Sequence, residues 1–315
     1  MKFISKKLNV KNVTNFESLA LHAKADLLCL MVGEFPELQG VIGRYYALNE
    51  GHANDFADAI EDHYNPKFSG GKLPREQMGD MLAIADKIET LMSLFSIGEK
   101  PTGVKDPFAL RRNAIGLIRI LAEKNIPLEL DELLKTFYPS SDLKSLNELT
   151  SFIQDRLINY LKDKGFTPQQ VEAVAGEMPK TLDNILERAN AVKLFSQLNQ
   201  SEDLASANKR VVNILKKYNS NNIETIDPSL LIENEEKFLF KSLNETSKKI
   251  REFVKARDYD RALSILINLK EPIDLFFEKI MVNADDDAIK KNRHNLLIQL
   301  YKEMNCVANI SKLST

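Results

Sequence analysis

The chain has 315 residues, of which 43% are hydrophobic and 28% are charged, and its formal net charge is −2. These proportions are typical of a folded protein of about two domains, and they exclude an intrinsically disordered chain. A net charge near zero also excludes a protein that coats nucleic acid indiscriminately, but it is compatible with a local basic surface.

Three features of the sequence bear on the cellular compartment of the protein. No apolar run reaches the roughly 18 residues that a membrane span needs, so we expect no membrane association. The first ten residues, MKFISKKLNV, carry charge without an apolar segment, which is not the pattern of a secretory signal. Cys29 and Cys306 are the only cysteines and lack metal-ligand spacing. Two free thiols in a reducing cytoplasm are therefore expected.

Helical periodicity dominates the chain. There are only 12 glycines and 11 prolines, and nearly every long segment has apolar residues at a period near 3.6. We therefore predict an all-α protein without a fixed-period repeat. In the first long segment, Leu19, Leu27, Leu30 and Met31 are expected in the core. The helices are expected at 16–32, 37–48, 53–63, 77–95, 107–121, 130–137, 147–164, 168–178, 181–198, 204–218, 235–255, 258–269, 271–280 and 284–298.

The stretch 98–121 combines a basic loop with an amphipathic helix. Asp106 followed by Pro107 is a strong helix-start signal, because Asp accepts a free backbone N–H and Pro has none to leave unpaired. The expected apolar face holds Leu110, Ala114, Leu117, Ile118 and Leu121. Lysines 100 and 105 and arginines 111, 112 and 119 lie away from that face. An ordinary solvated polar face is the alternative to a binding role for these bases.

Histidines and aspartates on the N-terminal helices raise the possibility of a metal site. His22, Asp26, Asp62, His63 and Asp86 are the kind of scatter with which an HD-type phosphohydrolase holds a divalent metal. That chemistry requires an adjacent His-Asp pair, and none of the four histidines is directly followed by Asp. We therefore predict no metal site, and expect Asp26 and Asp86 to bond to nearby lysines or backbone groups. No GxSxG motif, P-loop or recognisable cysteine nucleophile is present, so no catalytic residue is predicted.

The C-terminal part has a basic helix and an acidic turn. The expected helix at 204–218 carries Lys209, Arg210, Lys216 and Lys217. The three aspartates at 285–287 precede another helix, where negative charge complements the helix dipole, so no Ca²⁺ site is needed to explain them. Arg293 is expected to brace this turn.

Five blocks of the sequence resemble the β subunit of bacterial glycyl-tRNA synthetase. The last block is also similar to the DALR-type anticodon-binding domain of arginyl-tRNA synthetase. The matches run in order and cover nearly all of the chain, but that family has further domains upstream, so only its C-terminal part is represented. The blocks are KADLLCLMVGEFPELQGVIGRYYA (24–47), LAIADKIETLMSLFSIG (82–98), KPTGVKDPFALRR (100–112), ANKRVVNILKK (207–217) and FFEKIMVNADDDAIKKNRHNLL (276–297).

The resemblance implies a domain organisation and a division of labour. It implies a degenerate HD-like helical domain in residues 1–126, a helical connecting region in 127–202 and a DALR-like helical-bundle anticodon-binding domain in 203–315. In this two-subunit class II enzyme the α subunit uses ATP, magnesium and glycine, so no cofactor is expected here. The implied partners are tRNA-Gly and the α subunit, in a cytoplasmic α2β2 heterotetramer.

Basic side chains on helix faces are expected to contact phosphates of the anticodon arm, while unstacked loop bases are read by stacking and hydrogen bonds. Two alternatives from other functional classes remain open. One is a stand-alone HD-type metal-dependent phosphohydrolase, and the other is a helical scaffold without an RNA role. The expected tRNA contacts are Lys105, Arg111 and Arg112 in the first domain and Lys209, Arg210, Lys216 and Lys217 in the last.

Overall fold

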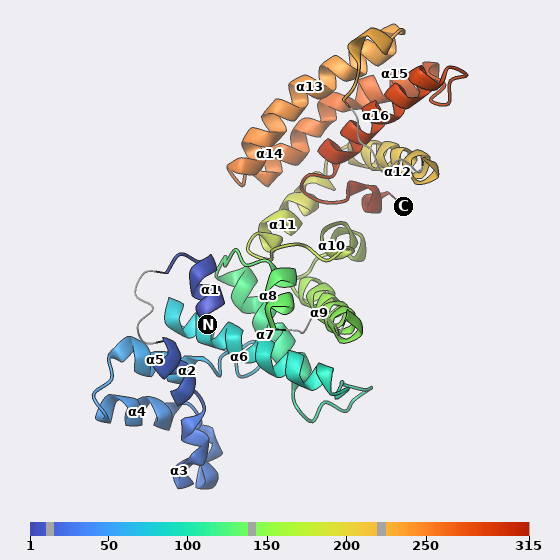
Figure 1. The fold of residues 1–315 in the computed structure, drawn as a ribbon. Coiled ribbons are helices and arrows are strands. Elements are labelled where there is room, and N and C mark those ends of the chain that lie inside the picture. The colour runs from blue at the N-terminus through green and yellow to red at the C-terminus, as the bar shows by residue number, and fades with distance from the viewer. Residues whose placement is uncertain (11–15, 138–142, 219–224, 315) are drawn as a thin grey trace. The chain divides into compact units, whose positions relative to one another are not determined.

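The computed structural model describes residues 1–10, 16–137, 143–218 and 225–314. Within these ranges the chain is helical, with one isolated bridge between Thr102 and Lys105 and no strand (Figure 1). The predicted all-α fold is confirmed. No helix in the described ranges is long and apolar enough to cross a bilayer.

The chain divides into two compact units. Unit 1 contains Met1–Tyr160 and Met178–Asn184, and unit 2 contains Leu161–Glu177 and Ile185–Thr315. The finer division into three domains at residues 126 and 202 stays a prediction. We describe each unit by itself.

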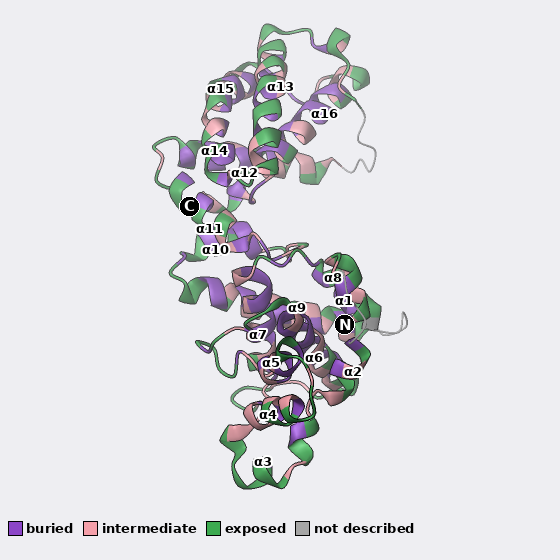
Figure 2. Ribbon diagram, turned by 90° about the vertical axis from the view of Figure 1, so that its left-hand side faces the viewer, coloured by how far each residue is buried: buried purple, intermediate pink, exposed green. Residues whose placement is uncertain are grey.

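Unit 1 is built around helices α6 and α7, which pack against each other, while α5, α8 and α1 contact α6. Their apolar faces are fully buried and form much of the purple interior in Figure 2. The elements are α1 (Lys2–Lys7), α2 (Phe16–His22), η1 (Ala25–Leu28), α3 (Leu30–Glu34), η2 (Pro36–Leu38), α4 (Val41–Asn49), α5 (Asn54–Asp62), α6 (Gln77–Ser96), α7 (Leu110–Glu123), α8 (Leu130–Phe137) and α9 (Leu143–Asp163), whose last residues belong to unit 2.

A buried lysine lies between α6 and α7. Lys87 of α6 donates a hydrogen bond from Nζ to the carbonyl oxygen of His63 at 3.1 Å. Burial lowers the pKa of Lys87 to about 8. A Cβ at Gly116 of α7 would lie only 2.7 Å from the Lys87 Cε, so the glycine makes room for this side chain.

The predicted helix at 16–32 is wrong, because the chain breaks into α2, η1 and α3. Lys24 adopts the left-handed conformation with φ of 63°, which ends the first helical segment. Leu19 is buried as expected, but Leu27, Leu30 and Met31 are exposed. The prediction that these three belong to the core is therefore also wrong.

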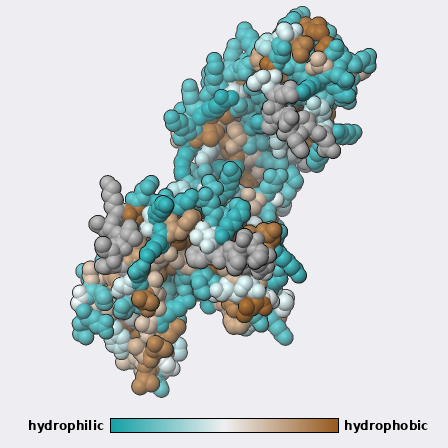
Figure 3. Space-filling model, in the orientation of Figure 1, coloured by the Kyte–Doolittle hydropathy of each residue, from teal (hydrophilic) through white to brown (hydrophobic). Residues whose placement is uncertain are grey.

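The broken segment carries an exposed apolar surface, which we define as Leu27, Leu28, Leu30, Met31 and Phe35. Leu28 is 90% exposed and Leu30 is 88% exposed. Figure 3 shows hydrophobic atoms gathered at the α3 end of unit 1. A folded protein rarely leaves a group of large apolar side chains in water, and such groups usually mark interaction sites.

Helix α7 begins three residues later than Pro107, and this part of the prediction is wrong. Ala109 has a φ of 53°, so the regular helix starts at Leu110. The Asp106 carboxylate still accepts the backbone N–H of Leu110 at 2.8 Å and of Arg111 at 3.0 Å. The expected capping chemistry is therefore present, and all five predicted apolar residues of α7 are buried.

The remaining helices lie near their predicted positions, with local differences. Gly40, with φ of 85°, separates η2 from α4, so the helix expected at 37–48 is shorter. The helix expected at 181–198 begins at Ile185, and the one expected at 258–269 divides into α14 and η4. Helix boundaries are set by backbone dihedrals that hydrophobic spacing does not report.

The first complete helix of unit 2 is well capped. Thr167 and Gln170 form a reciprocal capping box at the start of α10. Helix α12 contacts η5, α16 and α15, while α13 packs on α14 and α15. The elements are α10 (Pro168–Ala175), α11 (Ile185–Phe195), α12 (Ser201–Lys217), η3 (Pro228–Leu230), α13 (Asn234–Lys255), α14 (Tyr259–Ser264), η4 (Ile265–Leu269), α15 (Lys270–Lys279), α16 (Asp287–Met304) and η5 (Ile310–Leu313).

Candidate nucleic-acid interface

Helix α12 presents its bases to solvent because its other face is buried. Leu204, Ala205, Asn208 and Val211 are buried at helical spacing. The side chains on the opposite face are therefore held outside the core. The four bases predicted to contact tRNA, Lys209, Arg210, Lys216 and Lys217, are all exposed.

An amide pair fixes α12 against the end of α16. Asn208 donates from Nδ2 to Oδ1 of Asn305 at 2.8 Å, and Asn305 donates from Nδ2 to Oδ1 of Asn208 at 3.2 Å. The Asn305 oxygen also accepts the backbone N–H of Ile310 at 3.1 Å. Because Asn208 is buried, these bonds set the position of the neighbouring Lys209.

Three of the four predicted bases converge on one hollow, the α12–α16 pocket, with a volume of about 770 Å³. Lys290 and His294 of α16 line the same pocket, and so does Tyr218 at the end of α12. Among the described residues that line it, none is acidic. Such a concave group of cations with no carboxylate in its lining favours phosphate binding. The predicted bases in this pocket are Lys209, Arg210 and Lys217.

Two rings inside the α12–α16 pocket are stacked. The centroids of Tyr218 and His294 lie 3.8 Å apart with an interplanar angle of 17°. His294 Nδ1 lies 2.8 Å from the carbonyl oxygen of Lys290, which fixes the imidazole on its own helix. His294 is buried and Tyr218 is half-buried, so the tyrosine ring is a supported platform beside the cations.

Arg210 and Lys216 have different surroundings from Lys209 and Lys217. The Arg210 guanidinium lies over the ring of Phe277, 4.2 Å from its centroid. Lys216 lines a separate hollow of about 490 Å³, which it shares with Lys209. The structure therefore places Lys209 at both hollows and Lys216 outside the α12–α16 pocket.

Two family models match successive parts of the chain. A family model described as glycyl-tRNA synthetase beta subunit matches residues 1–176. The chain belongs to the glycyl-tRNA synthetase beta subunit family. A second model, described as DALR anticodon binding domain, matches residues 204–307, which include the cationic residues of the α12–α16 pocket.

Curated members of the glycyl-tRNA synthetase beta subunit family are similar along almost the whole chain. The glycine–tRNA ligase beta subunit of Methylobacillus flagellatus is 50% identical over 297 residues, covering 93% of this chain and 42% of the relative. That of Dechloromonas aromatica is 49% identical over 310 residues, covering 95% and 44%. That of Delftia acidovorans is 45% identical over 317 residues, covering 99% and 45%. The chain thus spans less than half the length of these relatives.

In this member of the glycyl-tRNA synthetase beta subunit family, Arg119 of α7 is held by hydrogen bonds to neighbouring groups of the same unit. Arg119 bonds to both carboxylate oxygens of Glu123, at 3.0 and 3.1 Å. It also donates to the carbonyl oxygens of Ser69 and Gly71, both at 2.8 Å. Arg119 therefore joins α7 to the loop that contains Ser69 and Gly71, and its donors are not directed at a ligand.

The three bases of unit 1 predicted to contact tRNA lie near the turn before α7. Arg111 donates from Nη2 to the carbonyl oxygen of Gly103 at 2.6 Å. Lys105 and Arg112 are exposed, and within the described residues no hydrogen bond or ion pair engages their side chains. Lys105 is placed by backbone hydrogen bonds with Thr102, at 2.8 and 3.0 Å.

The aspartates among the HD-type residues of unit 1 are engaged within the fold. Asp26 accepts the backbone N–H of Gly40 at 2.6 Å and the Tyr64 hydroxyl at 2.8 Å, and Asp86 pairs with Lys24. The prediction that these two aspartates bond to lysine or backbone groups is confirmed. Asp62 forms an ion pair with Arg75 at 3.0 Å. His63 is buried, and burial lowers its pKa.

The acidic turn before α16 acts as a helix cap. The Asp286 carboxylate accepts the backbone N–H groups of Ala288 at 2.8 Å and Ile289 at 3.0 Å, as the structural interpretation predicted. Arg293 does not brace this turn. Instead it pairs with the buried Glu236 and donates to the carbonyl oxygen of Met281 at 2.8 Å. This ion pair joins α16 to α13.

Proposed function

We propose that this chain is the tRNA-binding portion of the beta subunit of a two-subunit glycyl-tRNA synthetase, and that the α12–α16 pocket receives the anticodon arm of tRNA-Gly. The observation that carries the proposal is the convergence of Lys209, Arg210, Lys217 and Lys290 beside Tyr218. These residues fall in or beside the part of the chain that matches the DALR anticodon binding domain.

The chemistry of the pocket suits a looped RNA strand. Ammonium and guanidinium groups attract phosphates without reading sequence. An unstacked base can lie on the exposed side of the Tyr218 ring, because stacking on aromatic side chains is the common way to hold loop bases. The amide groups of Asn213 and Asn283, which also line the pocket, are suited to hydrogen bonds with base edges.

The proposal divides recognition and chemistry between the two subunits. We propose that the α subunit carries out glycine activation with ATP and Mg²⁺ and charges the tRNA. This portion of the beta subunit then holds no catalytic residue and no cofactor of that reaction, and the enzyme is a cytoplasmic α2β2 heterotetramer.

The basic residues of unit 1 are proposed as a second and weaker contact with the tRNA. Lys105 and Arg112 are exposed, and Arg111 joins α7 to the turn that precedes it through a hydrogen bond to Gly103. We propose that they contact the tRNA backbone at a second position, with smaller contributions than the α12–α16 pocket. We expect a smaller contribution because Arg111 already donates to the carbonyl oxygen of Gly103.

The test of this function is a binding titration with the complete α/β enzyme. The variant Lys209→Glu/Lys217→Glu reverses two cations of the pocket and spares Arg210, which packs on Phe277. We expect tRNA-Gly affinity to fall at least a hundredfold. The slope of log affinity against log salt should also fall by about 0.7 for each lost phosphate contact.

A matched control for this titration is Lys248→Glu/Lys249→Glu, which reverses two exposed lysines on α13 that do not line the pocket. It should retain affinity and salt slope, and an unrelated tRNA should bind all proteins weakly. If the pocket variant and the control behave alike, the α12–α16 pocket does not bind the anticodon arm.

The exposed apolar surface of unit 1 supports the proposed partner. The relatives are named beta subunits, and we propose that the α subunit packs on Leu27, Leu28, Leu30, Met31 and Phe35. The variant Leu28→Lys/Leu30→Lys should weaken co-purification of the α subunit, whereas Val104→Lys, at another exposed apolar side chain, should not. Unchanged assembly of the Leu28/Leu30 variant would place the α subunit elsewhere.

A further inference from the structure

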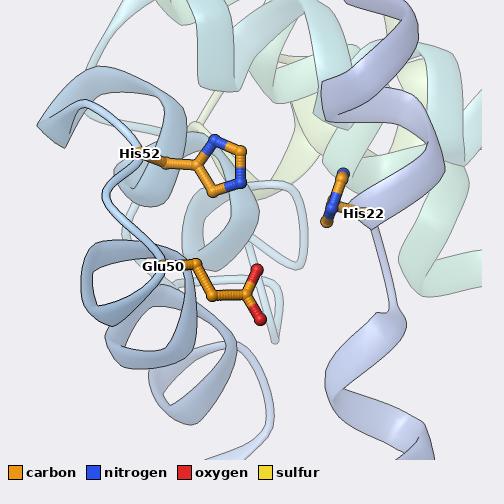
Figure 4. Close-up of side chains that lie close together, drawn as sticks. All are labelled: His22, Glu50 and His52. Atoms are coloured by element: carbon orange, nitrogen blue, oxygen red, sulfur yellow. The ribbon is translucent and has the colours of Figure 1, made fainter.

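Three metal-ligating side chains meet at the end of α4. His22 is the last residue of α2, and Glu50 and His52 flank Gly51 directly after α4. One ligand atom from each of the three lies within 4.8 Å of the other two. Figure 4 shows the three side chains directed toward a common space. Among the described residues, this is the one group of three such side chains that meets this distance.

The imidazole of His22 is oriented for binding through one nitrogen. Its Nδ1 lies 2.7 Å from the carbonyl oxygen of Ser18, which can only accept a hydrogen bond, so Nδ1 carries the proton. Nε2 is then the nitrogen with a lone pair available for a metal. A backbone carbonyl that holds the far nitrogen is the usual support for a metal-binding histidine.

The imidazole of His52 is also held before any ligand arrives. It stacks on Phe56 with centroids 4.2 Å apart and an interplanar angle of 9°. Phe56 is only 2% exposed and belongs to the hydrophobic core of unit 1. The backbone N–H of His52 donates to the carbonyl oxygen of Ala47 at 3.0 Å, and Gly51 adopts φ of 85°, so a tight turn fixes the backbone on both sides of Gly51.

We propose that His22, Glu50 and His52 form a binding site for a borderline-soft divalent transition metal ion, with Zn²⁺ as the best match. Two imidazoles and one carboxylate suit Zn²⁺, whereas Ca²⁺ and Mg²⁺ prefer oxygen ligands throughout. Tetrahedral coordination with bonds of about 2.0–2.1 Å places ligand atoms roughly 3.3 Å apart. Glu50 is exposed, so its side chain can rotate to close the remaining gap.

The site shares only His22 with the HD-type residues considered from the sequence. Asp26, Asp62 and Asp86 are held by other partners, and none of them belongs to this group. Metal binding would join the end of α2 to the turn after α4. An ion that binds the folded state alone stabilises it, and this stabilisation grows with ion concentration.

The experiment is a titration of the metal-free chain with Zn²⁺ by calorimetry, and with Co²⁺ by visible absorption, on wild-type protein, His52→Gln and Glu50→Gln. We expect one Zn²⁺ per chain, a higher unfolding temperature with Zn²⁺, and affinity at least tenfold weaker in both variants. The control Glu99→Gln makes the same change of charge on an exposed glutamate elsewhere in unit 1 and should bind as wild type does.

Several results would overturn the site. These are the absence of stoichiometric binding, equal affinity in wild-type and Glu50→Gln proteins, or a Co²⁺ spectrum with thiolate bands, which would move the ion to a cysteine. The unfolding temperature of each metal-free variant reports whether it is folded. If His52→Gln is unfolded because the stack on Phe56 is lost, Glu50→Gln decides the question, since its side chain is exposed.

Discussion

Helices α7 and α12 carry similar clusters of basic residues in the sequence, but these side chains have different surroundings in the fold. Around α7, Arg119 is bound to Glu123 and two carbonyl groups, and Arg111 is bound to Gly103. On α12, Lys209 and Lys217 reach an open pocket. The difference depends on whether oxygen acceptors of the same unit lie within reach, because a guanidinium with its donors already satisfied has little left for a ligand.

The largest effect should come from comparing two matched triple variants. Lys209→Glu/Lys217→Glu/Lys290→Glu reverses the α12–α16 pocket, and Lys105→Glu/Arg111→Glu/Arg112→Glu reverses the α7 cluster. We expect a loss of tRNA-Gly affinity of about 1,000-fold for the first, or about 4 kcal/mol, and of about tenfold or less for the second. Equal losses, measured by anisotropy at one salt concentration, would remove the distinction between the two helices.

The structural role of Arg119 predicts a loss of stability. Its side chain is 12% exposed, and Arg119→Ala leaves the Ser69 and Gly71 carbonyl groups without this donor. We expect the free energy of unfolding to fall by about 3 kcal/mol, with tRNA affinity unchanged. Arg112→Ala, on the same helix but exposed, is the control and should change stability by less than about 0.5 kcal/mol. Urea denaturation measures both.

The lysine buried beneath α7 predicts a dependence of stability on pH. The pKa of Lys87 is lowered to about 8 by burial, with Asp86 raising it and Lys24 and Arg112 lowering it further. Between pH 8 and about 10.5, the unfolded chain binds a proton at Lys87 that the folded chain does not, so the free energy of unfolding rises with pH across this window. Below pH 8 both states are protonated and the full cost of burying the charge remains.

The variant Lys87→Met should remove this pH dependence. At pH 7 it should raise the free energy of unfolding by about 2 kcal/mol, after allowing for the lost hydrogen bond to the His63 carbonyl. Lys248→Met, at an exposed lysine, should leave the pH profile unchanged. A wild-type profile that stays parallel to that of Lys87→Met from pH 8 to 10.5 would contradict the assignment.

The smallest effect concerns the aromatic platform of the α12–α16 pocket. Tyr218→Ala should weaken tRNA-Gly binding about tenfold, because one stacked base contributes roughly 1–3 kcal/mol. Tyr218→Phe keeps the ring that stacks on His294 and should retain most of the affinity. If both variants bind as wild type does, no base stacks on this ring.

Hydrophobic periodicity predicted most of the helices and the buried faces of α6 and α7, because those helices bury one continuous apolar stripe. It failed at residues 16–32, where no glycine or proline announces the left-handed Lys24. It also assigned Leu27 and Leu30 to the core, since periodicity cannot distinguish a side chain buried in its own fold from one exposed on an apolar surface. The residues wrongly assigned to the core are therefore among those that we propose as the contact with the α subunit.

Part of each candidate site could not be predicted from the sequence, because residues that meet in the fold are distant along the chain. The charge pattern of 204–218 identified Lys209, Arg210 and Lys217, but Lys290 and His294 were missed because α16 meets α12 only in the folded unit. The basic residues that follow the acidic turn at 285–287, Lys290 among them, were the signal in the sequence that could have identified this side of the pocket. His22 and His52 are also distant in the sequence, and the chain between them has positive φ values at Lys24 and Gly51 that hydrophobic spacing does not predict.

The exposed apolar surface has a consequence for experiments in solution. Salt weakens attraction between cations and phosphates, but a strongly hydrated anion such as sulfate favours the removal of leucine and phenylalanine side chains from water. Raising sulfate should therefore release RNA from unit 2 while promoting self-association through Leu28 and Leu30 of unit 1. Light scattering of the protein without RNA, recorded during the same sulfate titration, would report the clustering alone, because clustering raises the particle mass.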